Sequence, residues 1–128
     1  MDEPVSEFKS KSGLRRVLDA FGYSVEGVKA AWRHEFAFRQ EIVVVVFATL
    51  VALALPVSAF QKLMMIVVLL LVLMVELVNS AIEAVVDRVS LERHPLSKRA
   101  KDLGSAAVAM AIIIAALTWG TILFTRFY

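Results

Sequence analysis

The chain has 128 residues, of which 59% are hydrophobic, and its mean hydropathy is +0.74. This hydrophobic content exceeds that of an average soluble domain, and the length allows one domain. The net charge of +2 is too small to indicate a nucleic-acid-binding protein, and the lack of cysteine excludes disulfides and thiolate metal sites. The polar start MDEPVSEFKSKSG does not resemble a secretory signal peptide, and we expect residues 1–13 to be flexible.

Residues 14–40 are predicted to form an amphipathic helix on the membrane surface. Apolar residues recur at i, i+3, i+4 and i+7 from Leu14, and basic residues fill the other faces. Gly22 is expected to end this first run, and Ser24 is a candidate N-cap for a second helical stretch from Val25 to Phe36. The same apolar face is also compatible with packing on the membrane helices.

Three apolar blocks follow, and they predict membrane helices at about 42–60, 63–86 and 101–124. A membrane helix needs about 20 residues. The uninterrupted apolar part of the second block, residues 63–75, would reach only about 20 Å. This helix must therefore continue through Glu76 and Asn79, which places Glu76 at membrane depth and Glu83 near an interface. We find no internal repeat.

The distribution of Lys and Arg predicts the orientation of these helices. Residues 1–41 carry seven of them and residues 88–102 carry five, whereas the loop between the first two spans has only Lys62 and the C-terminus only Arg126. Because cytoplasmic loops are enriched in Lys and Arg, the N-terminus and the second loop are expected on the cytoplasmic side.

The segment VELVNSAIEAVVDR, residues 75–88, places polar residues on one face of the second span. At about 100° per residue, Glu83 and Asp87 point within about 20° of Glu76, and Asn79 and Ser80 flank them. Because an acid at the centre of a membrane helix costs about 2.5–3.5 kcal/mol, this polar seam requires a metal ion, a proton pathway or a buried cation. A seam that only joins helices in an oligomer is the alternative, which we favour for Asn79 and Ser80 alone but not for the acids.

Two further motifs carry charge near the cytoplasmic interface. In RHEFAFRQE, the spacing of Glu35 and Arg39 favours a simple surface ion pair. In HPLSKRAKDLGS, Ser97 is a candidate helix cap, and three cations, at positions 98, 99 and 101, either anchor the third span or hold an anion such as phosphate. Carboxylates and phosphates together suit Mg²⁺, so the pattern favours phosphoryl transfer to a lipid hydroxyl, although no GxxxxGK[ST] motif is present.

The four blocks GYSVEGVKAAW, HEFAFRQE, VELVNSAIEAVVDR and SKRAKDLGSAAV resemble, in order and spacing, the bacterial integral-membrane diacylglycerol kinases. The resemblance covers roughly residues 14–128. It implies an ATP-dependent enzyme that phosphorylates 1,2-diacylglycerol to phosphatidic acid. It also implies a homotrimer in the bacterial inner membrane, with active sites shared between subunits.

The resemblance also implies roles for individual residues. Glu76 would be the catalytic base, Asn79 and Asp87 would support the site, and Glu35 and Glu83 would bind Mg²⁺. The residues expected to bind ATP are Arg16, Tyr23, Glu35, Glu83, Glu92, Arg93, His94, Lys101 and Asp102. The residues expected to contact the lipid are Arg16, Ala20, Phe21, Gly22, Tyr23, Ser24, Val25, Lys29, Ala30, Ala31, Trp32, Ala37, Phe38, Arg39, Gln40, Glu41, Glu76, Ser105, Trp119, Gly120, Thr121, Ile122, Leu123 and Phe124.

Three other functions fit parts of the pattern. An undecaprenol kinase shares much of the motif, but GYS in the surface helix and FRQE before the first span favour diacylglycerol as the substrate. A small proton-coupled transporter would use Glu76 as its carrier acid, yet it predicts internal repeats or broken helices, which the sequence lacks. A non-enzymatic membrane subunit would use the seam only for assembly.

Overall fold

The computed structural model describes residues 12–128, so residues 1–11 of the segment expected to be flexible lie outside the described residues. The described chain forms four helices, α1 (Gly13–His34), α2 (Phe36–Ala54), α3 (Ala59–Val89) and α4 (Pro95–Phe127). Three of them, α2, α3 and α4, are long and apolar enough to cross a membrane. The predicted all-α membrane fold, with one N-terminal helix and three spans, is confirmed.

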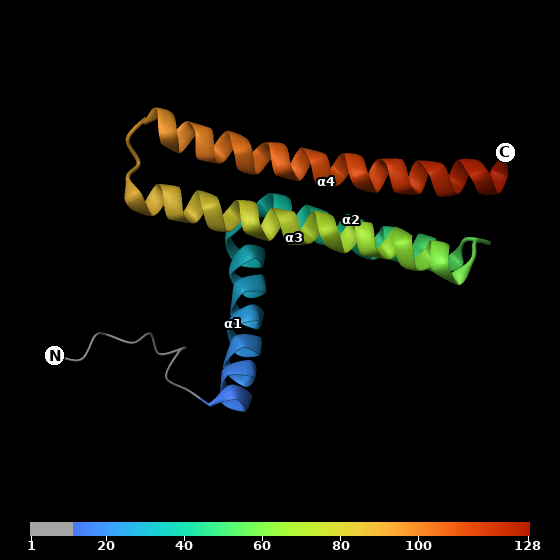
Figure 1. Cartoon of the computed structure of the whole chain (residues 1–128), viewed down its shortest axis with the longest axis horizontal. Coiled ribbons are helices and arrows are strands. Elements are labelled where there is room, and N and C mark those ends of the chain that lie inside the picture. Colours follow the sequence, from blue (N-terminus) through green and yellow to red (C-terminus); the bar gives the residue numbers. More distant parts are fainter. Residues whose placement is uncertain (1–11) are drawn as a thin grey trace.

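The three long helices form a bundle, and α1 projects away from it (Figure 1). α3 packs against both α2 and α4, whereas within residues 12–128 α1 contacts only α2 and α3. The buried residue of α1 is Ala31, near the end of the helix that meets the bundle. Most large apolar side chains of the spans are exposed, as in Val43, Phe47 and Leu117, which is the pattern of helices that face lipid or another protein chain.

α1 is one continuous helix, so the prediction that Gly22 ends a first run and Ser24 caps a second was wrong. The Ser24 hydroxyl instead donates to the Ala20 carbonyl, 2.9 Å away, within the same helix. Gly22 fits inside the helix because glycine costs only about 1 kcal/mol there. Ser24 fits because its hydroxyl is satisfied by the carbonyl four residues earlier. The apolar side chains of Leu14, Val17 and Phe21 are exposed along α1.

The helix boundaries differ from the expected ones because local chain geometry sets them. α1 ends at His34 and not at residue 40, since Glu35 is extended, with φ −115° and ψ 103°, and α2 begins directly after it. α2 ends at Ala54 and not at about residue 60, because Pro56 disfavours a helical residue before it. The three long helices start at residues 36, 59 and 95, whereas the predicted membrane segments start at about 42, 63 and 101.

The last two spans begin with well-defined caps. At the start of α3, the Gln61 amide donates to the Ser58 hydroxyl at 3.1 Å, and the Ser58 amide donates to the Gln61 side chain at 2.9 Å, which forms a capping box. At the start of α4, Nδ1 of His94 accepts from the Leu96 amide at 3.1 Å, and Pro95 occupies the first turn. The expectation that Ser97 caps this helix was therefore wrong.

The lengths of α3 and α4 exceed the thickness of a bilayer. With 31 and 33 residues at about 1.5 Å per residue, these helices are about 46 and 50 Å long, against about 30 Å for the hydrocarbon core. α2 has 19 residues and matches the core at about 28 Å. Several turns of α3 and α4 therefore extend beyond the hydrocarbon layer.

We call the end of the bundle that holds the α3–α4 connection, residues 90–94, the linker end, and the opposite end the loop end. At the loop end, Trp119 Nε1 donates to the Met65 carbonyl at 3.0 Å, and Arg126 Nε donates to the Pro56 carbonyl at 2.6 Å. A small buried core of Ala52, Met65 and Ile122 lies there. Side chains from all three spans thus fix the loop end.

Candidate active site

The predicted polar seam runs along α3 toward the linker end. Glu76 and Asn79 are buried, with exposed fractions of 8% and 9%, and they are the buried polar residues of the described chain. Farther along α3, Ser80 and Glu83 are half-buried and Asp87 is exposed. The seam therefore joins an acid inside the bundle to an acid at the surface, as the order of apolar and polar residues along the helix predicts.

Three other carboxylates lie near Glu76. Those of Glu83 and Glu35 are close enough to it for electrostatic repulsion, and Glu41 of α2 interacts with it in the same way. The extended backbone at Glu35 ends α1 where α1, α2 and α3 meet, which explains how this residue reaches the seam. The predicted surface ion pair between Glu35 and Arg39 was wrong, because it does not form among the described residues. The Arg39 guanidinium instead lies 5.6 Å from the centroid of the Phe36 ring. One carboxylate oxygen of Glu41, Oε2, is buried and has no hydrogen-bond partner among the described residues.

Asn79 connects this cluster to α4. Its Nδ2 donates to Oε1 of Glu83 at 3.4 Å. Its Oδ1 is buried without a hydrogen-bond partner in the described part of the chain, and it lies where a β-carbon at Gly104 would stand. Gly104 is itself buried. The missing side chain of Gly104 therefore makes room for the amide that contacts Glu83.

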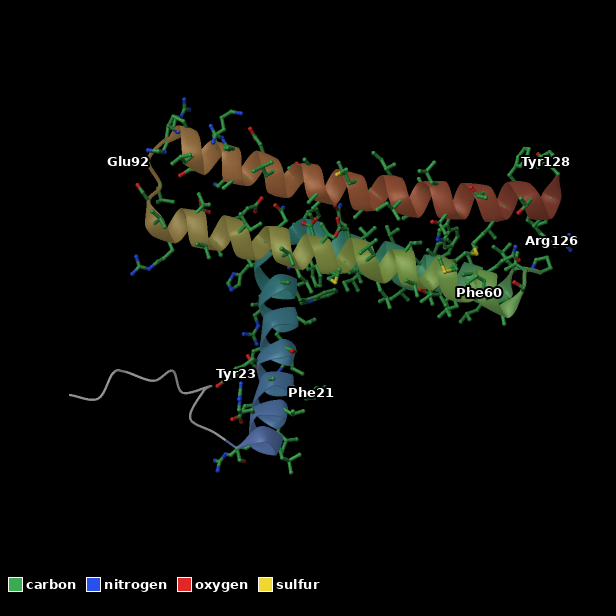
Figure 2. The ribbon with its side chains drawn as sticks, viewed as in Figure 1. Phe21, Tyr23, Phe60, Glu92, Arg126 and Tyr128 are labelled. Carbon is green, nitrogen blue, oxygen red and sulfur yellow. The ribbon has the colours of Figure 1, made fainter. Side chains whose placement is uncertain are left out.

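A cavity of about 640 Å³ opens at the linker end. Its volume is within the range of small-molecule sites. It lies between the end of α3 and the start of α4, and Figure 2 shows Glu92 in the connection between them. The residues that line it are Val86, Asp87, Ser90, Leu91, Glu92, Arg93, His94, Pro95, Ser97, Lys98 and Lys101.

Two ion pairs hold the lysines of this cavity. Lys101 Nζ binds Oδ1 of Asp87 across α3 and α4 at 2.8 Å. Lys98 Nζ binds Oδ2 of Asp102 within α4 at 2.6 Å. Cations beside a helix N-terminus at a membrane interface are suited to an anionic ligand such as phosphate.

The structure brings some of the expected ATP-binding residues together and leaves others apart. Glu92, Arg93, His94 and Lys101 line the cavity, and Asp102 contacts it only through Lys98. Arg16 and Tyr23 lie on α1, which has no contact with α4 in the described chain. Figure 2 shows Tyr23 well away from Glu92. A single chain therefore does not assemble the whole set.

The residues expected to contact lipid are also divided. Residues 20–25 and 29–32 lie on α1, residues 37–41 on the first turns of α2, and Ser105 on α4 beside Gly104. Residues 119–124 lie at the loop end, where Trp119 contacts the Met65 carbonyl and Ile122 is buried in the core. Ser105 and Trp119 are about 21 Å apart along α4, so these stretches do not form one compact surface in a single chain.

Sequence reasoning missed three features of this region. Gly104 carried no signal, because its role depends on how closely α4 approaches Asn79. Glu41 was expected only to contact lipid, although it also belongs to the acidic cluster around Glu76. Lys98 was not distinguished from its neighbours, although its spacing of three residues from Lys101 predicts a shared helix face.

Taken together, the fold and the site define a helical membrane protein with a buried acid and a cation-lined cavity joined by one polar seam. Residues 22–123 match the family model described as prokaryotic diacylglycerol kinase. The diacylglycerol kinase of Pseudomonas aeruginosa is 57% identical over 118 residues, which cover 92% of this chain and 96% of that protein. The diacylglycerol kinase of Escherichia coli K12 is 51% identical over 116 residues, or 91% and 95% of the two chains.

A more distant relative, the diacylglycerol kinase of Haemophilus influenzae, is 42% identical over 113 residues and covers 88% of this chain and 96% of its own. The chain belongs to the prokaryotic diacylglycerol kinase family. The match includes the polar seam, the linker and the first turns of α4.

Proposed function

We propose that this chain is an ATP-dependent diacylglycerol kinase, which transfers the γ-phosphoryl group of ATP to the hydroxyl of 1,2-diacylglycerol and yields phosphatidic acid. The observation that carries this proposal is the similarity to diacylglycerol kinases at 51–57% identity over more than nine-tenths of the chain. The geometry supports it, because the seam leads from an open cavity at the linker end, which water-soluble ATP can reach, to an acid buried inside the bundle.

In this mechanism Glu76 is the general base. It accepts the proton of the lipid hydroxyl while the hydroxyl oxygen forms a bond to the γ-phosphorus, and the bond from that phosphorus to the bridging oxygen of ADP breaks. The proton stays on Glu76 until the products leave. Glu76 suits this role because it is buried in the bundle, from which bulk water is largely excluded.

The nucleotide lies along the seam in this proposal. Asp87, at the cavity, is eleven residues from Glu76, which corresponds to about 16 Å along α3. ATP must therefore point its phosphates from the cavity toward Glu76. Lys101, Asp102 and the linker residues Glu92, Arg93 and His94 bind it at the cavity end.

Glu35 and Glu83 are proposed to hold Mg²⁺ together with the ATP phosphates. No group of three acidic or histidine side chains within residues 12–128 forms a complete metal site. Two carboxylates near Glu76 nevertheless fit, because Mg²⁺ is commonly held by one or two carboxylates, water and substrate phosphates. When bound, the ion neutralises phosphate charge. Asn79 keeps Glu83 in position through its amide.

The substrate lipid is proposed to enter between α1 and the first turns of α2. Of the residues named above as lipid contacts, 29–32 on α1 and 37–41 on α2 lie within about two turns of Glu35. Ser105 lies on α4, which contacts α3. The stretch 119–124 would contact the lipid nearer the loop end, within the apolar part of the bundle.

A homotrimer with shared active sites explains why one chain does not assemble the nucleotide site. Arg16 and Tyr23 lie on α1, which does not touch α4 within the described chain. A neighbouring copy can bring its own α1 to this cavity. We place the assembly in the bacterial inner membrane, with the N-terminus and the linker end in the cytoplasm, because the Lys and Arg residues concentrate there.

Phosphorylation of dioleoylglycerol by the purified protein in mixed micelles, with ATP and Mg²⁺, tests the proposal. We expect clear turnover by the wild type and a fall in kcat of about 10²–10⁴-fold for Glu76→Gln, because general base catalysis contributes about that much. Glu26→Gln, an exposed acid on α1, is the control. A fully active Glu76→Gln would remove Glu76 as the base.

A second lipid substrate and an ion-flux measurement separate the other functions. Turnover of undecaprenol in strong preference to dioleoylglycerol would identify the chain as an undecaprenol kinase. Ion flux in proteoliposomes without ATP, combined with no kinase activity, would identify a transporter. If neither activity is found and Glu76→Gln leaves the protein unchanged, the seam is interpreted as serving only in assembly.

A further inference from the structure

The first turns of α4 carry three cations, Lys98, Arg99 and Lys101, and the proposed site uses only Lys101. We propose that Lys98 is a further nucleotide-binding residue, whose ammonium group binds phosphate oxygens of ATP beside Lys101. This inference rests on the proposed kinase function and adds a residue to its nucleotide site.

The position of Lys98 separates it from Arg99. Lys98 and Lys101 both line the cavity at the linker end, and Arg99 does not. The spacing explains the difference, because residues three apart share a helix face. Figure 2 shows nitrogen-bearing side chains gathered on these first turns of α4, next to Glu92.

Lys98 has donors left for a ligand. A lysine ammonium has three donors, and in the described chain Lys98 donates to one oxygen of Asp102, at 2.6 Å. The Lys98 side chain is 78% exposed, so it can turn toward the cavity without uncovering a buried group. Lys101, 44% exposed and bound to Asp87, is placed in the same way. Each lysine can therefore keep its carboxylate and still donate to a phosphate oxygen.

The surroundings of Lys98 favour an anion. The N-terminus of a helix is a region of positive potential, where a cation is disfavoured and an anion is favoured. Both lysines nevertheless lie within the first two turns of α4. A phosphate group between them would satisfy the cations and the helix terminus at once, and the hydroxyl of Ser97, which also lines the cavity, is a further donor.

The test compares Lys98→Gln with Arg99→Gln, a matched control one residue away. We expect Lys98→Gln to raise the KM for ATP by about fivefold with kcat nearly unchanged, because a partly exposed ion contact contributes about that factor. Lys98→Arg should stay close to the wild type. Inhibition by inorganic tripolyphosphate should weaken by the same factor in Lys98→Gln, whereas inhibition by adenosine should not change.

A double-mutant cycle separates a direct contact from an effect through Asp102. If Lys98 only neutralises Asp102, then Lys98→Gln will have no effect on the KM for ATP in an Asp102→Asn background. We expect the KM to rise in that background too. No rise there would make Lys98 a positioning residue and overturn the proposal.

Two further outcomes would also overturn it: an unchanged KM for ATP in Lys98→Gln, or an equal rise in Arg99→Gln. If Lys98→Gln does not fold, Lys98→Met is measured with the same criteria. Failure of the proposed kinase function has a different signature, since the wild type would then not phosphorylate dioleoylglycerol. Direct binding of tripolyphosphate to the wild type and to Lys98→Gln would still test Lys98 in that case.

Discussion

Replacing Gly104 by alanine tests how the approach of α4 to α3 supports the site. The new β-carbon would overlap Oδ1 of Asn79, while its contact with Ile82 would be ordinary, at 3.8 Å. The overlap is with the end of a short side chain inside the bundle, so the Asn79 amide must turn away. It would then lose its hydrogen bond to Glu83.

The effects on stability and on activity are expected to differ in size. Overpacking of a tight interior costs about 1–3 kcal/mol, and the change from glycine to alanine within a helix returns about 1 kcal/mol. The net loss of stability is therefore about 0–2 kcal/mol. Activity should fall more, by about 10–100-fold, which is the usual effect of removing a group that orients a metal ligand.

The assay is phosphorylation of dioleoylglycerol at saturating ATP over a range of Mg²⁺ concentrations. Gly104→Ala should need more Mg²⁺ for half-maximal activity. Gly27→Ala is the control, because a β-carbon there has no neighbour within 4 Å, and it should keep wild-type activity. A folded Gly104→Ala protein with activity and Mg²⁺ dependence within about twofold of the wild type would refute the link from Gly104 to Glu83.

Two other substitutions test the ion contacts at the two ends of the bundle. Asp87→Asn removes the ion pair that Lys101 forms at 2.8 Å. The KM for ATP should then fall by up to about fivefold, because such exposed pairs contribute at most about 1 kcal/mol. A raised KM would instead mean that Asp87 holds Lys101 in its binding position. Arg126→Gln removes the 2.6 Å contact with the Pro56 carbonyl at the loop end and should lower stability by about 1 kcal/mol in an SDS unfolding titration. Its kinase activity should not change, and a large loss of activity would contradict the separation of the two ends.

The seam could be predicted from the sequence because helical periodicity alone decides which residues share a face. Glu76, Glu83 and Asp87 needed no knowledge of neighbouring helices to be placed on one line. The gradient from buried Glu76 to exposed Asp87 also follows from the order of apolar and polar residues along α3. The shared face and the burial gradient of the seam thus follow from the kinds of side chain and their spacing along one helix.

The boundaries and the partners could not be predicted in the same way. Hydropathy gives the shortest length that crosses a membrane, whereas Glu35, Pro56 and Pro95 decide where each helix begins or ends. Gly104 depends on the distance between two helices, which no single segment encodes. Arg16 and Tyr23 lie on α1, which does not contact α4 in the described chain, so helical spacing alone does not bring them to the cavity.

The short α2 has a consequence for the membrane around the protein. α3 and α4 are several turns longer than the hydrocarbon core is thick, whereas α2 is only about as long as the core. α2 also begins directly after Glu35. Hydrophobic mismatch is therefore absorbed at α2, by tilt or by local thinning of the bilayer. In a thicker membrane we expect the start of α2 to be drawn toward the bilayer, which would move Glu35 relative to the longer α3 that carries Glu76. Bilayer thickness is thus expected to affect the distance between the Glu35 and Glu76 carboxylates. The surrounding lipid would then influence this protein mechanically as well as supply its substrate.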